Sequence, residues 1–159
     1  MRLIIAAVGR LKDGPERLLF EKYRDRFEAI GRQLGLAPVL WAETPESRAA
    51  TASQRQAEEE AALKRLARGA ETMIALQLDA RPITSAGFAQ LLARIRDEGT
   101  RVAAFTIGGP DGLSGALLAA AKHKVSFGAI TLPHQLARIV LAEQLYRAAT
   151  ILAGHPYHR

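Results

Sequence analysis

The sequence predicts an α/β domain with a parallel sheet covered by helices on both faces. Short apolar runs and helix-like segments alternate five times along the chain, as in folds built from strand–helix units. The apolar runs lack period-two alternation, which is typical of strands buried on both faces. With 159 residues, of which 48% are hydrophobic and 24% charged, the chain is expected to form one domain over residues 1–159.

The first half of the chain is expected to contain three strands and two helices. The strands are predicted at residues 3–8, 36–41 and 73–78. A helix follows Asp13-Gly14-Pro15, with its apolar residues toward one side, and a second is predicted over residues 56–68, where Gly69 provides a stop. Residues 44–55, between the second strand and the second helix, are expected to form a loop.

The second half repeats the pattern. Thr84-Ser85 can cap a helix that ends at Gly99. The remaining elements are strands at residues 102–107 and 125–132 and helices at residues 116–122 and 135–152. We therefore expect five strands, each followed by a helix.

The last predicted helix has two apolar faces. One contains Leu136, Ile139 and Val140, and the other contains Leu141, Leu145, Ala148 and Leu152. Either the helix is buried by its own domain, or one face packs on the sheet and the other on a second subunit. Because a C-terminal helix is rarely central in a domain of this size, the pattern favours a homodimer.

Charge and composition restrict the possible functions. The net charge is +6, and residues 81–159 hold 9 Lys and Arg against 4 Asp and Glu, whereas residues 1–80 hold 13 against 12. This excess favours a polyanionic partner such as nucleic acid. The absence of cysteine excludes disulfides, thiolate zinc sites and cysteine nucleophiles. No apolar run is long enough to span a bilayer, so a soluble cytoplasmic protein is expected.

Two segments lie where strands are predicted to end. Residues 105–114 place three glycines between a strand and a helix, where backbone N–H groups can face a ligand. Their spacing fits neither a P-loop nor a dinucleotide fingerprint, and a tight turn without a ligand explains them slightly better. Residues 130–135 join the fifth strand to the last helix and could share a ligand crevice with the first segment. On its own, His134 is better explained as a structural hydrogen-bonding residue.

The C-terminal segment, residues 154–159, ends in Tyr157-His158-Arg159. A frayed tail is the default expectation for such a terminus. His155 and His158 could suggest a metal, but without cysteine or a nearby carboxylate pair the ligand count falls short, so no metal is expected.

Taken together, these segments resemble the RlmH family of ribosomal RNA methyltransferases. The resemblance rests on residues 107–114, 131–134, 136–138, 142–148 and 155–159. It covers essentially the whole chain, with a mild departure at residues 124–129. It implies a SPOUT fold whose C-terminal part forms a trefoil knot, in a homodimer.

The resemblance also implies a function. The family transfers a methyl group from S-adenosylmethionine to N3 of a pseudouridine in helix 69 of 23S ribosomal RNA, on the assembled ribosome. The residues that match its cofactor positions are Leu78, Gly109, Gly128, Ala129, Ile130, Thr131, Leu132 and Pro133. Another RNA substrate and a non-catalytic ribosome-associated dimer are the alternatives.

Residues for catalysis and RNA binding are assigned as hypotheses. His158 could accept the proton from N3 and Arg159 could stabilise the resulting anion, or the tail could only close a dimer interface. Arg138 and Arg147, expected on the polar side of the last helix, are candidate RNA contacts. Each could instead pair with a carboxylate such as Glu143.

Overall fold

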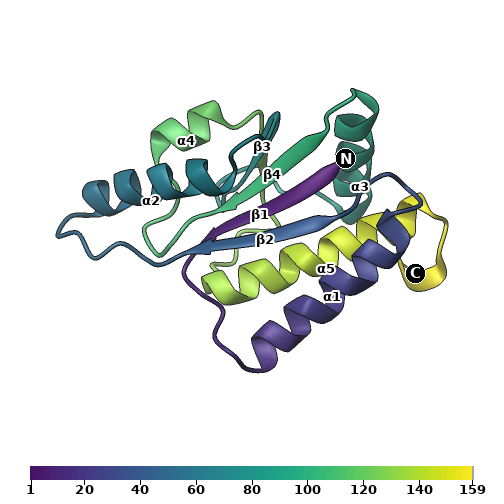
Figure 1. The fold of residues 1–159 in the computed structure, drawn as a ribbon, viewed down its shortest axis with the longest axis horizontal. Helices are drawn as coiled ribbons and strands as arrows, with labels where there is room; N and C mark the ends of the chain where they lie inside the picture. The colour runs from purple at the N-terminus through teal and green to yellow at the C-terminus, as the bar shows by residue number, and fades with distance from the viewer. Residues whose placement is uncertain (159) are drawn as a thin grey trace.

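The computed structural model describes residues 1–158 and contains one sheet of five parallel strands. The strands are β1 (Arg2–Val8), β2 (Val39–Thr44), β3 (Thr72–Leu76), β4 (Val102–Ile107) and β5 (His123–Val125). Their order across the sheet is β2-β1-β4-β3-β5, so β2 and β5 are the edges (Figure 1). Every pairing is parallel, as the uniformly apolar strands predict.

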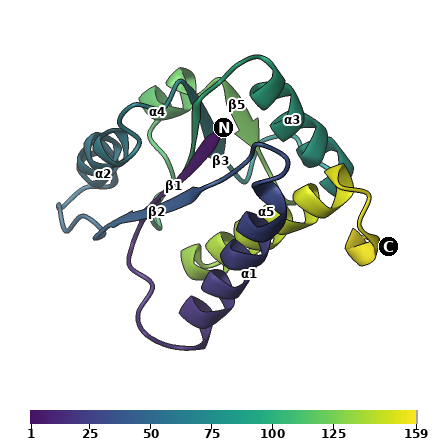
Figure 2. The same cartoon turned by 45° about the vertical axis from the view of Figure 1, so that its right-hand side comes forward.

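Helices cover both faces of the sheet (Figures 1 and 2). They are α1 (Pro15–Gly31), α2 (Ala52–Leu66), α3 (Ser85–Asp97), α4 (Gly115–Ala120) and α5 (His134–Leu152), followed by the short 3-10 helix η1 (Pro156–His158). Helices α1, α3 and α5 pack in one buried cluster with Leu3 and Ile5 of β1, whereas α2 and α4 pack with Ile4 and Ala6. Successive β1 side chains thus face opposite layers, and the predicted fold class is confirmed. The trefoil knot remains a prediction.

Several predicted boundaries were wrong: the second strand, expected at residues 36–41, is β2 at Val39–Thr44, and two further differences have identifiable reasons. Helix α2 begins at Ala52, inside the expected loop, because Thr51 and Gln54 form a reciprocal capping box. The last strand ends at Val125 instead of residue 132, and only Ser126 continues the pairing, through a bridge to Pro82. Gly128 then adopts φ +127°, which a β-strand cannot contain, so residues 126–133 form a loop.

The two apolar faces of α5 do not support the dimer that was inferred from them in the sequence. Leu141, assigned to a subunit interface, is fully buried, and Leu145 and Ala148 lie in the same cluster of the chain's own core. Helix α5 packs against both α1 and α3, so most of its apolar side chains are buried within one protomer, although Leu136 is exposed. Among residues 1–158, no helix is long and apolar enough to cross a membrane.

Candidate functional site

Three loops meet at the carboxyl ends of neighbouring strands. The pairing of β3 with β4 aligns Ala75 with Thr106, so Leu78 and Gly109 lie at the same level, each three residues beyond an aligned pair. The pairing of β3 with β5 aligns Leu76 with Val125 and brings Gly128 close to that level. Because an open parallel sheet binds ligands at the carboxyl ends of its strands, this edge is the candidate site.

Ser126 joins two of these loops. Its hydroxyl oxygen lies 3.0 Å from the Leu78 carbonyl oxygen and 3.1 Å from that of Gly128, and it accepts a hydrogen bond of 3.2 Å from the Gly128 N–H. Its carbonyl accepts from the Ile83 N–H at 3.0 Å. The Ser126 side chain is buried, so the contact acts as an internal clamp. The structure thus brings Leu78 and Gly128 together, and their role in cofactor binding stays a prediction.

The rest of the loop after β5 exposes apolar side chains. Residues 129–133 are all exposed, and Ile130 is 78% exposed. Leu78, Leu132 and Leu136 are also exposed, so the clamped loops and the first turn of α5 supply four of the seven large exposed hydrophobic residues described. Exposed apolar groups concentrated in this way indicate a surface that a ligand or partner covers.

Helix α2 holds the glycine-rich turn after β4. The Arg55 guanidinium donates to both carboxylate oxygens of Asp111, at 2.6 and 2.9 Å, and the Gln56 side chain donates to the Asp111 carbonyl at 2.7 Å. The turn closes on itself through a 2.9 Å bond from the Gly112 N–H to the Gly109 carbonyl. Arg55 lowers the pKa of Asp111 through this hydrogen bond. The turn is therefore fixed from the α2 side.

Gly109 packs closely against the chain itself. A Cβ at this position would lie 3.0 Å from Val8 Cγ1 and 3.0 Å from Glu59 Oε2. Glu59 is 4% exposed, and its Oε2 has no hydrogen-bond partner among the described residues. Its Oε1 accepts from the Ser47 N–H at 3.0 Å. A side chain here would need Val8 or Glu59 to shift, so packing favours a glycine, and a role in cofactor binding stays a prediction.

Arg138 is not an RNA contact, because the structure buries it completely. Its guanidinium forms an ion pair with Glu43 and donates to the backbone carbonyls of Val8 and Gly9, the latter at 2.9 Å. Burial lowers the pKa of Arg138, whereas the Glu43 and Glu46 carboxylates raise it. The prediction was wrong because the side chain turns inward toward three acceptors at the ends of β1 and β2.

This arrangement fixes the start of α5. His134 Nε2 lies 3.7 Å from Glu46 Oε1, and a Cβ on Gly9 would lie 2.7 Å from the same nitrogen. Glu43 also accepts a 2.9 Å bond from the Leu11 N–H. Since Pro133 is the N-cap of α5, the residues that end the exposed loop are anchored to the sheet.

The tail lies at the opposite end of α5 from the loop (Figures 1 and 2). The Tyr157 ring packs on Tyr146 with centroids 4.5 Å apart, and its hydroxyl donates to Glu143 at 3.2 Å. Tyr146 is twelve residues beyond His134, or about 18 Å along the helix axis. Tyr157 therefore packs away from the loop after β5 of the same chain. Arg159 and the side chain of His158 lie outside the described residues.

Arg147 is held by its own helix. Its guanidinium donates to Glu143 at 2.7 and 2.9 Å and lies 5.0 Å from the centre of the Tyr157 ring. The alternative of a pair with Glu143 is thus confirmed. Burial, together with hydrogen bonding to Tyr23, raises the pKa of Tyr157 to about 12.

Two grooves flank the candidate site. The first, of about 310 Å³, lies between α2 and the loop after β2. It is lined by Thr44, Pro45, Glu46, Ser47, Arg48, Glu58, Glu59, Ala62 and Arg65. The second, of about 550 Å³, is the β5 groove, lined by Arg81, Pro82, Ile83, Thr84, Leu91, Lys122, His123, Lys124 and Val125. Within residues 1–158, no group of three His, Cys, Asp or Glu side chains is placed to hold a metal ion.

Comparison with known proteins agrees with this architecture. A family model described as "Predicted SPOUT methyltransferase" matches residues 1–158. A protein of Nitrobacter winogradskyi named "Ribosomal RNA large subunit methyltransferase H" is 54% identical over 159 residues, covering 100% of this chain and 99% of its own. A Bradyrhizobium protein of the same name is 52% identical with the same coverage.

Solved structures share the fold at low sequence identity. A probable methylase family protein from Haemophilus influenzae superposes with a TM-score of 0.54 at 12% identity, over 99% of this chain and 70% of that chain. A probable methyltransferase from Bordetella pertussis gives a TM-score of 0.52 at 19% identity, over 93% and 96% of the two chains.

The fold and the loops at the strand ends thus define a protein of the methyltransferase class. The chain belongs to the SPOUT methyltransferases and, among them, to the family of ribosomal RNA large subunit methyltransferase H.

Proposed function

We propose that the protein transfers a methyl group from S-adenosylmethionine to N3 of a pseudouridine in helix 69 of 23S ribosomal RNA, on the assembled ribosome. The observation that carries the proposal is the full-length similarity, above 50% identity, to proteins named as large-subunit ribosomal RNA methyltransferases. The second half of the chain, with its positive excess, suits an RNA substrate.

The residues present fit the cofactor. The adenine ring of S-adenosylmethionine needs apolar side chains to cover it and backbone groups to hydrogen-bond with it. The backbone of the binding loop must therefore come close to the cofactor. Leu78, Ile130 and Leu132 offer exposed apolar surface, and Gly128 has nothing within 4 Å of the place a Cβ would occupy. We assign the cofactor to Leu78, Gly109 and residues 128–133.

S-adenosylmethionine supplies, when bound, a methyl group on a positively charged sulfur. The chain must then hold the target base in line and let its N3 proton leave. We assign proton acceptance to His158 and stabilisation of the N3 anion to Arg159. Neither step requires a metal.

A homodimer follows from this assignment. Residues 128–133 are called the cofactor loop. The tail packs on the far end of α5, about 18 Å along the helix from the cofactor loop of the same chain. If the cofactor loop and the tail act on the same base, the tail must come from a second copy of the chain. The protein is then active as a dimer whose sites are shared.

Methyl transfer to purified ribosomes tests the proposal and its alternatives. With labelled cofactor, ribosomes lacking the modification should become labelled, whereas transfer RNA should not. Label on transfer RNA alone would support the first alternative. A protein that shows no titration heat with S-adenosylmethionine and leaves both RNAs unlabelled would be the non-catalytic dimer. Single-turnover rates of His158→Ala and Arg159→Ala then separate the two assigned roles.

A further inference from the structure

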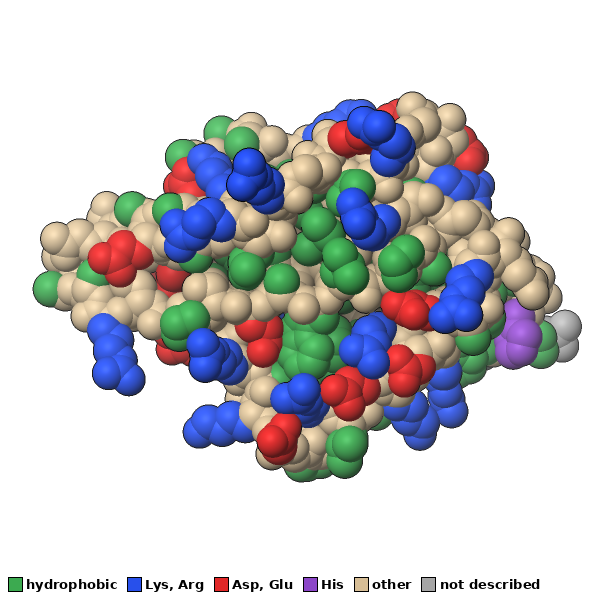
Figure 3. Space-filling view, in the orientation of Figure 1, with side chains coloured by type: hydrophobic (Ala, Val, Ile, Leu, Met, Phe, Trp, Pro, Cys, Tyr) green, Lys and Arg blue, Asp and Glu red, His purple; other side chains and the backbone are tan. Residues whose placement is uncertain are grey.

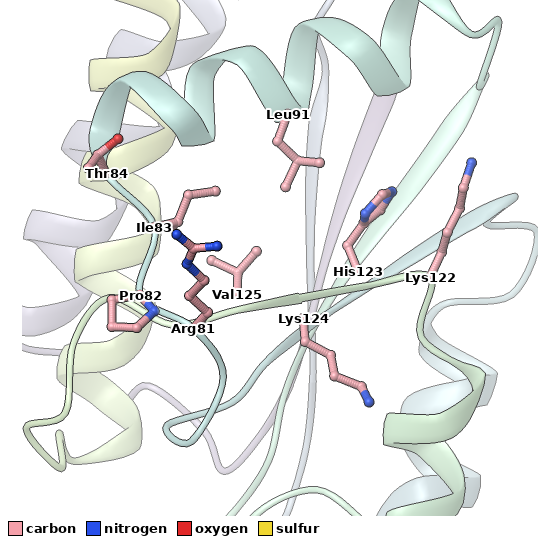
Figure 4. Close-up of a pocket in the computed structure, with 9 residues that line it drawn as sticks. All are labelled: Arg81, Pro82, Ile83, Thr84, Leu91, Lys122, His123, Lys124 and Val125. Carbon is pink, nitrogen blue, oxygen red and sulfur yellow. The ribbon is translucent and has the colours of Figure 1, made fainter.

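The β5 groove lies directly beside the candidate site. Arg81 and Pro82 come from the same loop as Leu78, and Val125 immediately precedes Ser126, whose hydroxyl clamps that loop. The bridge between Pro82 and Ser126 forms one end of the groove. From there the groove follows the edge strand β5 back to Lys122 (Figure 4). A chain lying in it would pass from the edge of the sheet to the cofactor loop.

The charge of the groove is positive, and only one of its three cations pairs with a carboxylate among the described residues. Three of its nine lining residues are Arg81, Lys122 and Lys124, and none is acidic. Lys122 pairs with Glu98 at 2.9 Å outside the groove, but Arg81 and Lys124 are exposed and form no ion pair within residues 1–158. Burial, followed by the nearby Lys122, lowers the pKa of His123, so the positive charge comes from the Arg and Lys side chains.

Many basic residues outside the groove pair with carboxylates. On the face shown in Figure 3, Lys and Arg side chains are spread over the surface and interspersed with acidic ones. Arg138 and Arg147, the basic residues of α5, are both tied to carboxylates. Figure 4 shows Arg81, Ile83 and Val125 toward one end of the groove and Lys122 toward the other, with Leu91 between them, whereas Lys124 points to the opposite side of β5 from Leu91. Separated cations around an apolar floor suit successive phosphates of one strand.

We propose that the β5 groove binds the phosphate backbone of ribosomal RNA next to the methylated nucleotide and so guides that strand to the cofactor loop. This inference rests on the proposed function, because it takes the substrate from it. Arg81 and Lys124 are the phosphate contacts, and neither is among the residues assigned to the cofactor. An edge strand can instead pair with a strand of a ribosomal protein, which the test must separate.

The test compares two double variants that each remove two exposed cations. Arg81→Gln/Lys124→Gln alters the groove, and Arg2→Gln/Arg68→Gln is the control, at the amino ends of the strands. Dissociation constants for unmodified 70S ribosomes are measured from about 50 to 300 mM salt, with cofactor titration of each variant. The groove variant should bind about tenfold more weakly than the control near 150 mM salt and reduce the salt slope by about two. Its cofactor affinity should match the wild type.

Three results would overturn the inference. Equal ribosome affinities for the two variants would place the phosphate contacts elsewhere, and weaker binding with an unchanged salt slope would indicate a protein strand on β5. Wild-type protein that does not bind ribosomes would also exclude the groove as an RNA surface. If the wild type binds ribosomes through the groove but labels no RNA, the proposed function fails while the groove assignment stands.

Discussion

Replacing Arg138 with methionine removes the charge that joins the start of α5 to the ends of β1 and β2. Methionine keeps a similar length, but it leaves the Glu43 carboxylate with only the Leu11 N–H and leaves the Val8 and Gly9 carbonyls without this donor. Breaking a buried ion pair on one side costs about 3–5 kcal/mol. For a domain of this size, that loss lowers Tm by about 6–20 °C.

The assay is urea unfolding followed by circular dichroism, with Arg147→Met as the matched control. Arg147 pairs with Glu143 on the same helix, but its side chain is 28% exposed, so its loss should cost about 1 kcal/mol or less. Glu43→Gln should couple to Arg138→Met in a double-mutant cycle by more than 1 kcal/mol, as contacting buried groups do. An Arg138→Met variant as stable as the Arg147→Met variant would refute the reasoning.

Three further predictions concern Gly109, Gly128 and Tyr157. Gly109→Val should lower the free energy of unfolding by about 1–3 kcal/mol, since even its Cβ meets Val8 and Glu59 at 3.0 Å, and a variant with wild-type urea midpoint would contradict that packing. Gly128→Ala, with φ +127° but open space around it, should cost about 1–3 kcal/mol of backbone strain and weaken cofactor binding, and unchanged titration heats would argue against the loop. The pKa of Tyr157 is raised to about 12, so the folded state keeps its proton where the unfolded state loses it, and stability should fall between pH about 10 and 12. Tyr157→Phe should flatten that fall, and an unchanged alkaline profile would show that Tyr157 does not cause it.

The fold could be predicted because its signals are local. Uniformly apolar strands and glycine stops are visible in the sequence, and Thr84 caps α3 as expected, accepting from the Gly87 N–H at 3.0 Å. The capping box was also visible in the sequence, because Gln54 comes three residues after Thr51. This motif predicts a helix that starts directly after Thr51, as α2 does.

The contacts of the site could not be predicted because they join distant parts of the chain. Arg138 meets Glu43 across 95 positions, and Arg55 meets Asp111 across 56. An arginine between apolar positions of a helix gives no indication of the carbonyls it will meet. The tail lies far from the loop after β5 for a related reason, because a helix of 19 residues separates its own ends by about 28 Å.

The central claim is methyl transfer at one position of ribosomal RNA, and mass spectrometry of that RNA tests it most directly. Unmodified ribosomes are incubated with the protein and S-adenosylmethionine, and the 23S fragment containing helix 69 is digested to nucleosides. We expect one pseudouridine of that fragment to carry a methyl group at N3, and none when the protein is omitted. A methyl group on another nucleotide, or an unmethylated fragment despite bound cofactor, would contradict the account.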